Sequence, residues 1–203
     1  MKVLHIDASL RQAGSVSREM SQAFIDHLKK EKNIEVDRLD LATEKLDHIT
    51  QLYAEAMYAM PNQYTPEQEK ELEISNGLVD RVMDAELMVI GTPTYNFGIP
   101  SNLKTFIDLT VRSGRTFMYT EAGFEGKLGD KKVVVINSRG LSYAEEETSG
   151  NDHVTGYLKT ILGFVGITDV QFVHLDPTFF GEEATNAAKA RAKEEFATIV
   201  DSL

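Results

Sequence analysis

Residues 87–101 read Leu-Met-Val-Ile-Gly-Thr-Pro-Thr-Tyr-Asn-Phe-Gly-Ile-Pro-Ser, a pattern that indicates a strand, a loop and the start of a helix. Its first four residues form a continuous apolar run between Glu86 and Gly91, which is typical of a strand buried on both faces. Two prolines stiffen the loop that follows, and beyond Ser101 apolar residues recur at helical spacing. A buried strand that leads through a loop into a helix is the repeating unit of an α/β fold.

The same unit recurs along the chain. The other predicted strands are residues 3–6, 34–39, 133–136 and 170–173, and the predicted helices are residues 15–32, 66–84, 101–114, 153–164 and 183–202. Ser101 is expected to cap the third of these helices and Gly114 to end it. The connections have the lengths of parallel crossovers, so we predict one α/β domain over residues 1–203, a five-stranded parallel sheet with helices on both faces.

The composition excludes several functions. Acidic residues outnumber basic ones by 32 to 21, and the formal charge of -11 should repel nucleic-acid phosphates and anionic membranes. Cysteine is absent, which excludes disulfides, thiolate metal sites and a cysteine nucleophile. The 5 histidines do not stand at metal-ligand spacing, so no metal site is expected. The amino terminus lacks the apolar run of a signal peptide, and a cytoplasmic protein is the expectation.

The first predicted strand ends in a hydroxyl-rich loop. Ser9, Ser15 and Ser17 stand where the chain enters the helix of residues 15–32. A helix start presents free backbone N–H groups and a partial positive charge, so it can hold a phosphate without a lysine. The same serines could also do no more than cap the helix and form a turn. The Gly-Lys-Ser/Thr ending of a triphosphate P-loop is missing, as is the G-x-G-x-x-G of a dinucleotide fold.

The loop after residues 87–90 contains Thr94, Tyr95, Asn96 and Phe97. A planar ring stacks on aromatic side chains, and its carbonyls and ring nitrogens accept hydrogen bonds from amides. This loop is therefore a candidate for holding a heteroaromatic cofactor. The alternative is a structural turn in which Tyr95 and Phe97 join the core.

A third loop, Ser138-Arg139-Gly140-Leu141, follows residues 133–136. It could be an ordinary connection, or its N–H groups could face the same ring. Residues 140–144 superficially resemble the nucleophile elbow of hydrolases, but the second glycine is missing. Because ligands in such folds bind beyond the carboxyl ends of the strands, the loops together predict phosphate donors beside a ring site. Flavin mononucleotide (FMN) has that shape.

Several longer segments are distinctive: Pro93–Phe97, Leu103–Asp108, Thr116–Thr120, Ser138–Gly140 and Leu162–Val170. They resemble the FMN-dependent NADH:azoreductases and NAD(P)H:quinone reductases of the flavodoxin-like superfamily. The resemblance spans nearly the whole chain and is weakest in residues 43–64. It implies a doubly wound, flavodoxin-like sheet of strand order 2-1-3-4-5. It also implies a homodimer with one FMN per subunit, bound where both chains meet, that reduces quinones and azo compounds with NADH or NADPH.

The resemblance also implies cofactor contacts at positions of this chain. Ser9, Ser15, Val16 and Ser17 would hold the phosphate, Thr94, Tyr95, Asn96 and Phe97 would lie beside the isoalloxazine ring, and Ser138, Arg139 and Gly140 would complete the ring site. Leu141 stands where the family usually has a second glycine, so its side chain must point away from the flavin or narrow the pocket. Methionine is common where Thr94 stands. Neither change removes a backbone donor, so we expect FMN binding to survive while substrate preference shifts.

The resulting hypothesis is a ping-pong reaction in which NADH delivers a hydride to flavin N5 and leaves before an electron-poor acceptor takes its place. The cofactor carries this chemistry, so no catalytic side chain is expected. A flavodoxin-type electron carrier to a protein partner is the alternative, and an acidic surface suits it. A flavin-free protein of the same topology is a third reading.

Residues 43–64 cannot be placed from their pattern, and residues 115–130 show no clear period. Residues 43–64 and the 115–126 loop are the candidates for the dimer face and the pocket wall. Exposed apolar side chains in the first of these segments would be a liability in water; they are Tyr53, Met57, Tyr58 and Met60. Phe117 and Tyr119 are the candidates for the acceptor pocket. Phe117 and Tyr119 could instead simply pack under a long loop, and helical spacing could bury the methionines within one chain.

Overall fold

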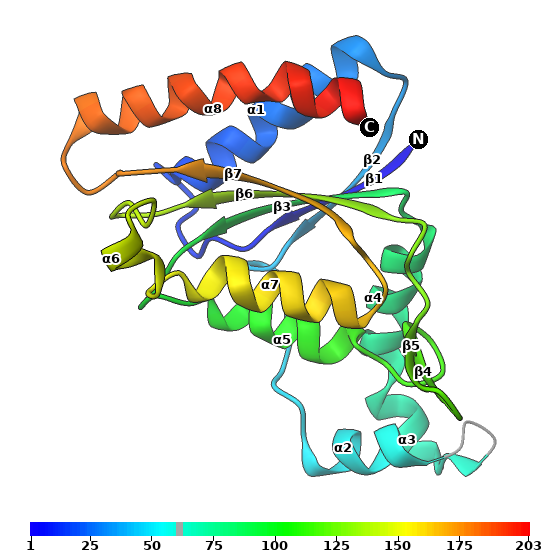
Figure 1. Ribbon diagram of the computed structural model, residues 1–203. Coiled ribbons are helices and arrows are strands. Elements are labelled where there is room, and N and C mark those ends of the chain that lie inside the picture. The colour runs from blue at the N-terminus through cyan, green and yellow to red at the C-terminus, as the bar shows by residue number, and fades with distance from the viewer. Residues whose placement is uncertain (60–62) are drawn as a thin grey trace.

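The computed structural model describes residues 1–59 and 63–203 and contains a five-stranded parallel sheet (Figure 1). Its strands are β1 (Lys2–Asp7), β2 (Glu35–Asp40), β3 (Leu87–Pro93), β6 (Lys132–Ser138) and β7 (Asp169–Leu175). Their order in the sheet is β2-β1-β3-β6-β7. Since β6 and β7 are the fourth and fifth strands of this sheet along the chain, the predicted order 2-1-3-4-5 is confirmed.

The strand register brings the carboxyl ends of neighbouring strands to one edge of the sheet. Asp7 at the end of β1 pairs with Asp40 of β2 on one side and with Gly91 of β3 on the other. Pro93, the last residue of β3, pairs with Ser138, the last residue of β6. Every residue of β3 is buried, as its continuous apolar run predicts for a central strand covered on both faces.

Helices lie on both sides of this sheet in Figure 1. On one side are α1 (Val16–Glu31) and α8 (Glu182–Ser202), and on the other are α4 (Glu73–Asp84), α5 (Ser101–Thr110) and α7 (His153–Phe164). Two apolar clusters fill the layers, one centred on Phe24 and Phe196, whose rings meet edge to face at 5.1 Å. The other contains Ile90, Leu103 and Leu158.

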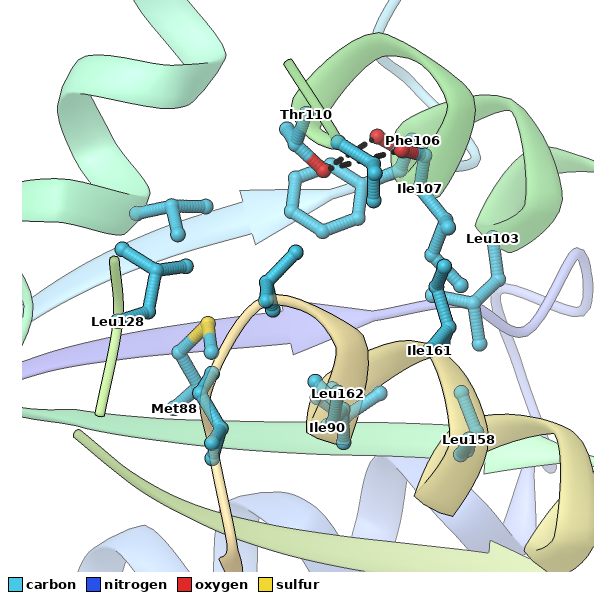
Figure 2. Close-up of a pocket in the computed structure, with 14 residues that line it drawn as sticks. Met88, Ile90, Leu103, Phe106, Ile107, Thr110, Leu128, Leu158, Ile161 and Leu162 are labelled. Carbon is cyan, nitrogen blue, oxygen red and sulfur yellow. Dashed lines mark hydrogen bonds between the residues drawn. The ribbon is translucent and has the colours of Figure 1, made fainter. Parts of the chain in front are cut away.

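A small cavity lies in this second cluster, between β3, α5 and α7 (Figure 2). Its volume is about 40 Å³ and its lining is almost wholly apolar, with Met88, Leu103 and Ile161 among the side chains that face it. An apolar space of this size is a packing defect of the core and is too small for a cofactor.

Two predicted helices differ from the structure, at three points. The helix predicted for residues 66–84 is divided at Leu72 into α3 (Pro66–Glu71) and α4, because α3 packs on α2 whereas α4 packs on α5 and the sheet. Ser101 is the first residue of α5 and does not cap it, since Pro100 occupies the cap position without a side-chain hydrogen bond. The helix ends at Thr110, well before Gly114.

The segment 43–64 contains α2 (Gln51–Tyr58), which Thr50 caps by accepting a hydrogen bond from Tyr53 N. Tyr53 is only 2% exposed, and its hydroxyl lies 3.2 Å from Ser75 Oγ and donates to the carbonyl of Leu109. The prediction that Tyr53 lies on an exposed dimer face is therefore wrong, since its ring is used to pack α2 onto the chain. Met57 is partly buried against the same core, while the side chain of Tyr58 and all of Met60 lie outside the described residues.

The segment 115–130, for which no period was found, forms an antiparallel hairpin of β4 (Phe117–Thr120) and β5 (Gly123–Gly126). Gly126 packs so closely on the chain at Val165 and Gly166 that a Cβ atom there would lie 2.1 Å from backbone atoms. A short helix, α6 (Glu146–Ser149), completes the elements. In the part of the chain that the structure describes, none of the helices has the length and apolar character that crossing a bilayer requires.

Candidate functional site

The three loops singled out in the sequence lie at the same edge of the sheet. They follow β1, β3 and β6, and backbone hydrogen bonds join them at their bases. Ala8 N donates to the carbonyl of Gly91 at 2.9 Å, and Thr94 N donates to the carbonyl of Ser138 at 2.8 Å. The structure therefore brings together the predicted phosphate loop, the predicted ring loop and the 138–141 loop.

The phosphate loop leads into α1 with Ser15 as its N-cap. The N–H groups of Val16 and Ser17 open the helix and have no hydrogen-bond partner among the described residues. Ser15 Oγ lies 3.3 Å from Ser17 Oγ, and Ser9 Oγ accepts a hydrogen bond from Arg11 N at 3.3 Å. The hydroxyls of Ser15 and Ser17 thus face each other, and that of Ser9 faces the loop backbone. This donor set, at the positive end of a helix with three turns or more, is complementary to a phosphate.

The ring loop turns sharply at Asn96 and Phe97. Both have positive φ, 50° and 66°, and Tyr95 and Gly98 exchange two backbone hydrogen bonds of 3.0 Å across them. Such a turn costs free energy for residues other than glycine, and strained backbone of this kind occurs often where a ligand is held. Among the described residues, the N–H groups of Asn96 and Phe97 have no acceptor, and Phe97 is 49% exposed. Two free donors beside an aromatic side chain suit a polar planar ring.

Asn137, the residue before Ser138, holds the ring loop to β6, and the sequence reading missed it. Its side chain is fully buried, and its Nδ2 donates to the carbonyl of Thr92 and to Thr94 Oγ1, both at 3.1 Å. The signal was present in the sequence, because an amide that directly follows the apolar run 133–136 needs partners at the strand end.

The Arg139 side chain does not reach toward the ring loop. It is buried and donates to Asp152 at 2.9 Å and to Asp176 at 2.5 Å, while its backbone N–H donates to the carbonyl of Leu175 at 2.9 Å, so the backbone of Arg139 offers no free donor to a ring site. Burial by itself would raise the pKa of Asp152, but hydrogen bonds from Thr155 and the charge of Arg139 lower it overall. Burial, aided by the positive charge of Arg139, lowers the pKa of His174 nearby.

The 138–141 loop is also tied to the loop that follows β7. Thr178 N donates to the carbonyl of Arg139 and Phe179 N to that of Gly140, at 3.0 and 3.1 Å. The N–H of Gly140 has no partner among the described residues. Leu141, Phe179 and Phe180 are exposed at this rim, and the two phenylalanine rings meet edge to face at 5.8 Å. These three side chains form an apolar rim beside the site, which was not predicted from the sequence.

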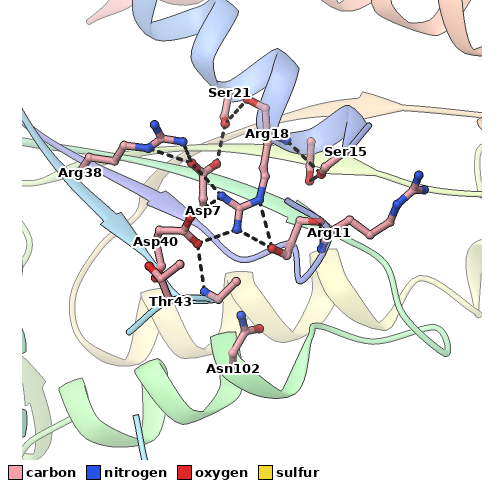
Figure 3. Close-up of polar contacts among 12 residues, drawn as sticks. Asp7, Arg11, Ser15, Arg18, Ser21, Arg38, Asp40, Thr43 and Asn102 are labelled. Carbon is pink, nitrogen blue, oxygen red and sulfur yellow. Dashed lines mark hydrogen bonds and ion pairs between the residues drawn. The ribbon is translucent and has the colours of Figure 1, made fainter. Parts of the chain in front are cut away.

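A cluster of charged residues lies behind the phosphate loop (Figure 3). Asp7 and Asp40 stand side by side at the ends of β1 and β2, and Arg18 reaches from α1 to both of them, with Arg38 on the outer side of Asp7. The hydrogen bond from Arg18 holds the pKa of Asp40 below its usual range, and the same contact raises the pKa of Arg18. Two neighbouring carboxylates at strand ends predict a buried cation, so this cluster could have been found from the sequence.

His5 and Ser21 extend this cluster toward β3. Ser21 Oγ donates to Asp7 Oδ1 at 3.0 Å and lies 2.9 Å from His5 Nε2. Burial lowers the pKa of His5, although the negative charge of Asp7 acts in the opposite direction.

Asn102, at the start of α5, has a buried Nδ2 that lacks a hydrogen-bond partner among the described residues. This amide is therefore a further donor close to the ring loop.

Phe117 and Tyr119 do not reach these loops within one chain. Phe117 packs on Phe164 with ring centroids 4.8 Å apart, and Tyr119 is 74% exposed. Figure 1 shows their hairpin at the far end of the sheet from the carboxyl edges of the strands.

The donors gathered at this edge define what the site can bind. Hydroxyls and helical N–H groups on one side and turn N–H groups with an aromatic side chain on the other match an anionic tail and a planar ring with acceptor atoms. No cluster of His, Asp and Glu able to hold a metal ion occurs in the described ranges 1–59 and 63–203. The donors at this edge therefore fit FMN.

Comparisons with known proteins agree with this assignment. The model of the flavodoxin-like fold family matches residues 1–200. An FMN-dependent NADH:quinone oxidoreductase 1 of Trichormus variabilis is 39% identical over 202 residues, 98% of this chain and 96% of that protein. The crystal structure of azoreductase AzrA is 28% identical, with a TM-score of 0.92 over 100% of both chains.

An FMN-dependent NADH-azoreductase from Bacillus anthracis, solved in complex with FMN, is 26% identical to this chain. It covers 98% of this chain and 99% of its own, with a TM-score of 0.86. A family match over nearly the whole sequence and a relative of 39% identity make the assignment direct. This chain belongs to the flavodoxin-like fold family.

Proposed function

We propose that the protein is an FMN-dependent NADH oxidoreductase that reduces quinones and azo compounds. The observation that carries the proposal is the convergence of the three loops, which places phosphate donors and ring donors at one edge of the sheet. The names of the relatives support the donor and the acceptors, since they are NADH:quinone oxidoreductases and azoreductases. Bound FMN would supply the hydride-accepting and hydride-donating atom, N5, that no side chain provides.

In this proposal the chain binds, orients and shields. The first turn of α1 with Ser9, Ser15 and Ser17 would hold the phosphate. The N–H groups of Asn96, Phe97 and Gly140 would face acceptor atoms of the ring. Because these donors are fixed in position before the ligand arrives, they favour negative charge on the reduced ring without further reorganisation.

The apolar rim provides the acceptor side of the site. Leu141, Phe179 and Phe180 would exclude water and pack on a planar acceptor. Leu141 is 47% exposed, and in this proposal its side chain points away from the ring. No protein group is needed to transfer a proton in the first half of the reaction.

We further propose a homodimer in which the hairpin of one chain covers the site of the other. The hairpin carries Tyr119 and Phe124, which are 74% and 65% exposed, in edge-to-face contact at 5.5 Å. Exposed aromatic pairs of this kind are typical of interfaces. Phe117 and Tyr119 would then line the acceptor pocket of the partner.

An electron carrier of the flavodoxin type is the second candidate, favoured by the formal charge of -11. Anaerobic mixing of the FMN-loaded protein with NADH separates the two. If the protein is a reductase, NADH should abolish the visible flavin absorbance, and a quinone or an azo dye added afterwards should restore it. Absorbance that NADH leaves unchanged would overturn the reductase. A ping-pong reaction further predicts parallel lines in double-reciprocal plots at several fixed quinone concentrations.

A further inference from the structure

The guanidinium of Arg18 is the most fully bonded group near the phosphate loop. It is 8% exposed, and it donates to both oxygens of Asp40 at 2.6 and 2.7 Å. Its Nε and NH2 groups also donate to the carbonyl of Ser9, at 3.1 and 2.6 Å, and NH1 lies 3.6 Å from Asp7 Oδ2. Each N–H edge of the guanidinium thus faces the carbonyl of Ser9, Asp40 or Asp7 (Figure 3).

The contact with Ser9 fixes the orientation of one peptide in the loop. Two donors from the same guanidinium occupy the Ser9 carbonyl, so this oxygen points at Arg18. In a trans peptide the following N–H points in the opposite direction. The N–H of Leu10 therefore points away from Arg18, and it has no hydrogen-bond partner among the described residues. A carbonyl turned toward an anion would repel it, whereas an N–H attracts it.

The charge of Arg18 is not what the loop would present to a phosphate. Asp40 and Asp7 lie against the guanidinium and offset its positive charge. Arg38 in turn offsets the negative charge of Asp7, since its NH2 group lies 2.7 Å from Asp7 Oδ2. Among these residues the two arginines and the two aspartates sum to no net charge at neutral pH. Arg18 can therefore influence the phosphate loop through the positions of its hydrogen bonds, and not through its charge.

We infer that Arg18 is a positioning residue for the phosphate of FMN, an inference that rests on the proposed function. It does not touch the phosphate. Its fork bridges Asp40, at the end of β2, and the carbonyl of Ser9, after β1, and so keeps the Ser9–Leu10 peptide in the orientation that offers N–H to the anion. A lysine would keep the charge but could not span both partners with a planar fork.

The test compares FMN with riboflavin, which has the same ring but lacks the phosphate. Dissociation constants of both flavins are measured by fluorescence titration of apoprotein for wild type, Arg18→Lys and Arg18→Gln. Both variants should lose about tenfold or more in affinity for FMN, the size expected for a hydrogen bond to an ionised ligand, with riboflavin affinity unchanged. Arg38→Gln is the matched control, because this half-exposed arginine also contacts Asp7 but not Ser9, and it should bind both flavins like wild type.

Three results would overturn the inference. Wild-type affinity for FMN in Arg18→Lys would show that charge suffices, and wild-type affinity in both variants would show that Arg18 plays no part. An equal loss for FMN and riboflavin would show general disruption of the site. A wild-type protein that binds neither flavin would instead overturn the proposed function.

Asp40→Asn keeps the inference testable if the Arg18 variants fail to fold, which thermal unfolding of the apoproteins would show. This substitution removes the carboxylate that binds the Arg18 guanidinium from β2, but it leaves the contact between Arg18 and the Ser9 carbonyl available. If the geometry matters, FMN binding weakens by about threefold or more and riboflavin binding does not change. If FMN binding becomes tighter, the phosphate senses the charge of Asp40 and the inference is wrong.

Discussion

Gly91→Ala is the substitution that tests most sharply how α1 is held against the sheet. Gly91 lies near the end of β3, opposite Ser21 of α1. A Cβ atom added at position 91 would lie 2.6 Å from Ser21 Oγ, 2.8 Å from Ser21 Cβ and 3.2 Å from Asp7 Oδ1. Carbon atoms in contact are normally about 3.5–4.0 Å apart, so about 1 Å of separation is missing.

The overlap cannot be relieved by rotating a side chain, because the Cβ of Ser21 is fixed to the backbone of α1. The helix must therefore move away from the sheet, and overpacking of this kind costs about 1–3 kcal/mol. The movement also strains the hydrogen bond from Ser21 to the buried Asp7, 3.0 Å long, which adds about 1 kcal/mol. We expect Gly91→Ala to lower the free energy of unfolding by about 3 kcal/mol, or roughly 6–12 °C in Tm.

Urea denaturation of a double-mutant cycle provides the assay. With Ser21→Gly as background the obstructing Cβ is gone, so Gly91→Ala should then cost less than about 1 kcal/mol. Gly156→Ala is the matched control, because nothing lies within 4 Å of a Cβ at that position of α7, and alanine should stabilise the helix by about 1 kcal/mol. A Gly91→Ala protein as stable as wild type, or one equally destabilised in both backgrounds, would refute the reasoning.

Other consequences can be measured separately. Ser15→Asp or Ser17→Asp should repel the phosphate and weaken FMN binding by about tenfold or more; unchanged affinity in a titration would show that the loop is misassigned. Asp40 has a lowered pKa because of its hydrogen bond from Arg18, so its contribution to stability is present above about pH 4 and is lost as the pH falls through the lowered pKa. Asp40→Asn should therefore be less stable than wild type at pH 7, with the gap closing toward pH 2 in urea titrations. Burial lowers the pKa of His174, so below about pH 6.5 the unfolded chain binds a proton that the folded chain does not. His174→Gln should accordingly lose less stability between pH 6.5 and pH 5, and an identical slope would contradict this. Sedimentation should give a dimer, and a fully active monomer would exclude the shared site.

The parallel sheet could be predicted because its strands carry continuous apolar runs. Residues 87–90 and 133–136 are buried on both faces, and no other arrangement of such runs satisfies both their burial and their alternation with helices. The hairpin of β4 and β5 could not be predicted in the same way. Its strands are short and half exposed, and their docking depends on glycine packing between Gly126 and Gly166, a contact distant in sequence.

In the site, too, features set by neighbouring residues could be predicted, whereas those set by contacts distant in sequence could not. The loops after β1, β3 and β6 were predictable, since parallel strands end at one edge. The Arg139 side chain was assigned to the ring site together with its backbone, but its direction depends on Asp152 and Asp176, which approach only in the fold. Tyr53 was expected on the surface because its partners, Ser75 and the carbonyl of Leu109, lie far along the chain.

A crystal structure of the protein with FMN would locate the flavin. We expect phosphate oxygens within hydrogen-bond distance of Ser15 and of the N–H groups that open α1. We expect the ring between residues 94–97 and 138–141, with the N–H groups of Asn96 and Phe97 directed at its acceptor atoms. A flavin bound elsewhere on the chain, or crystals grown with excess FMN that contain none, would show that the three loops do not form the cofactor site.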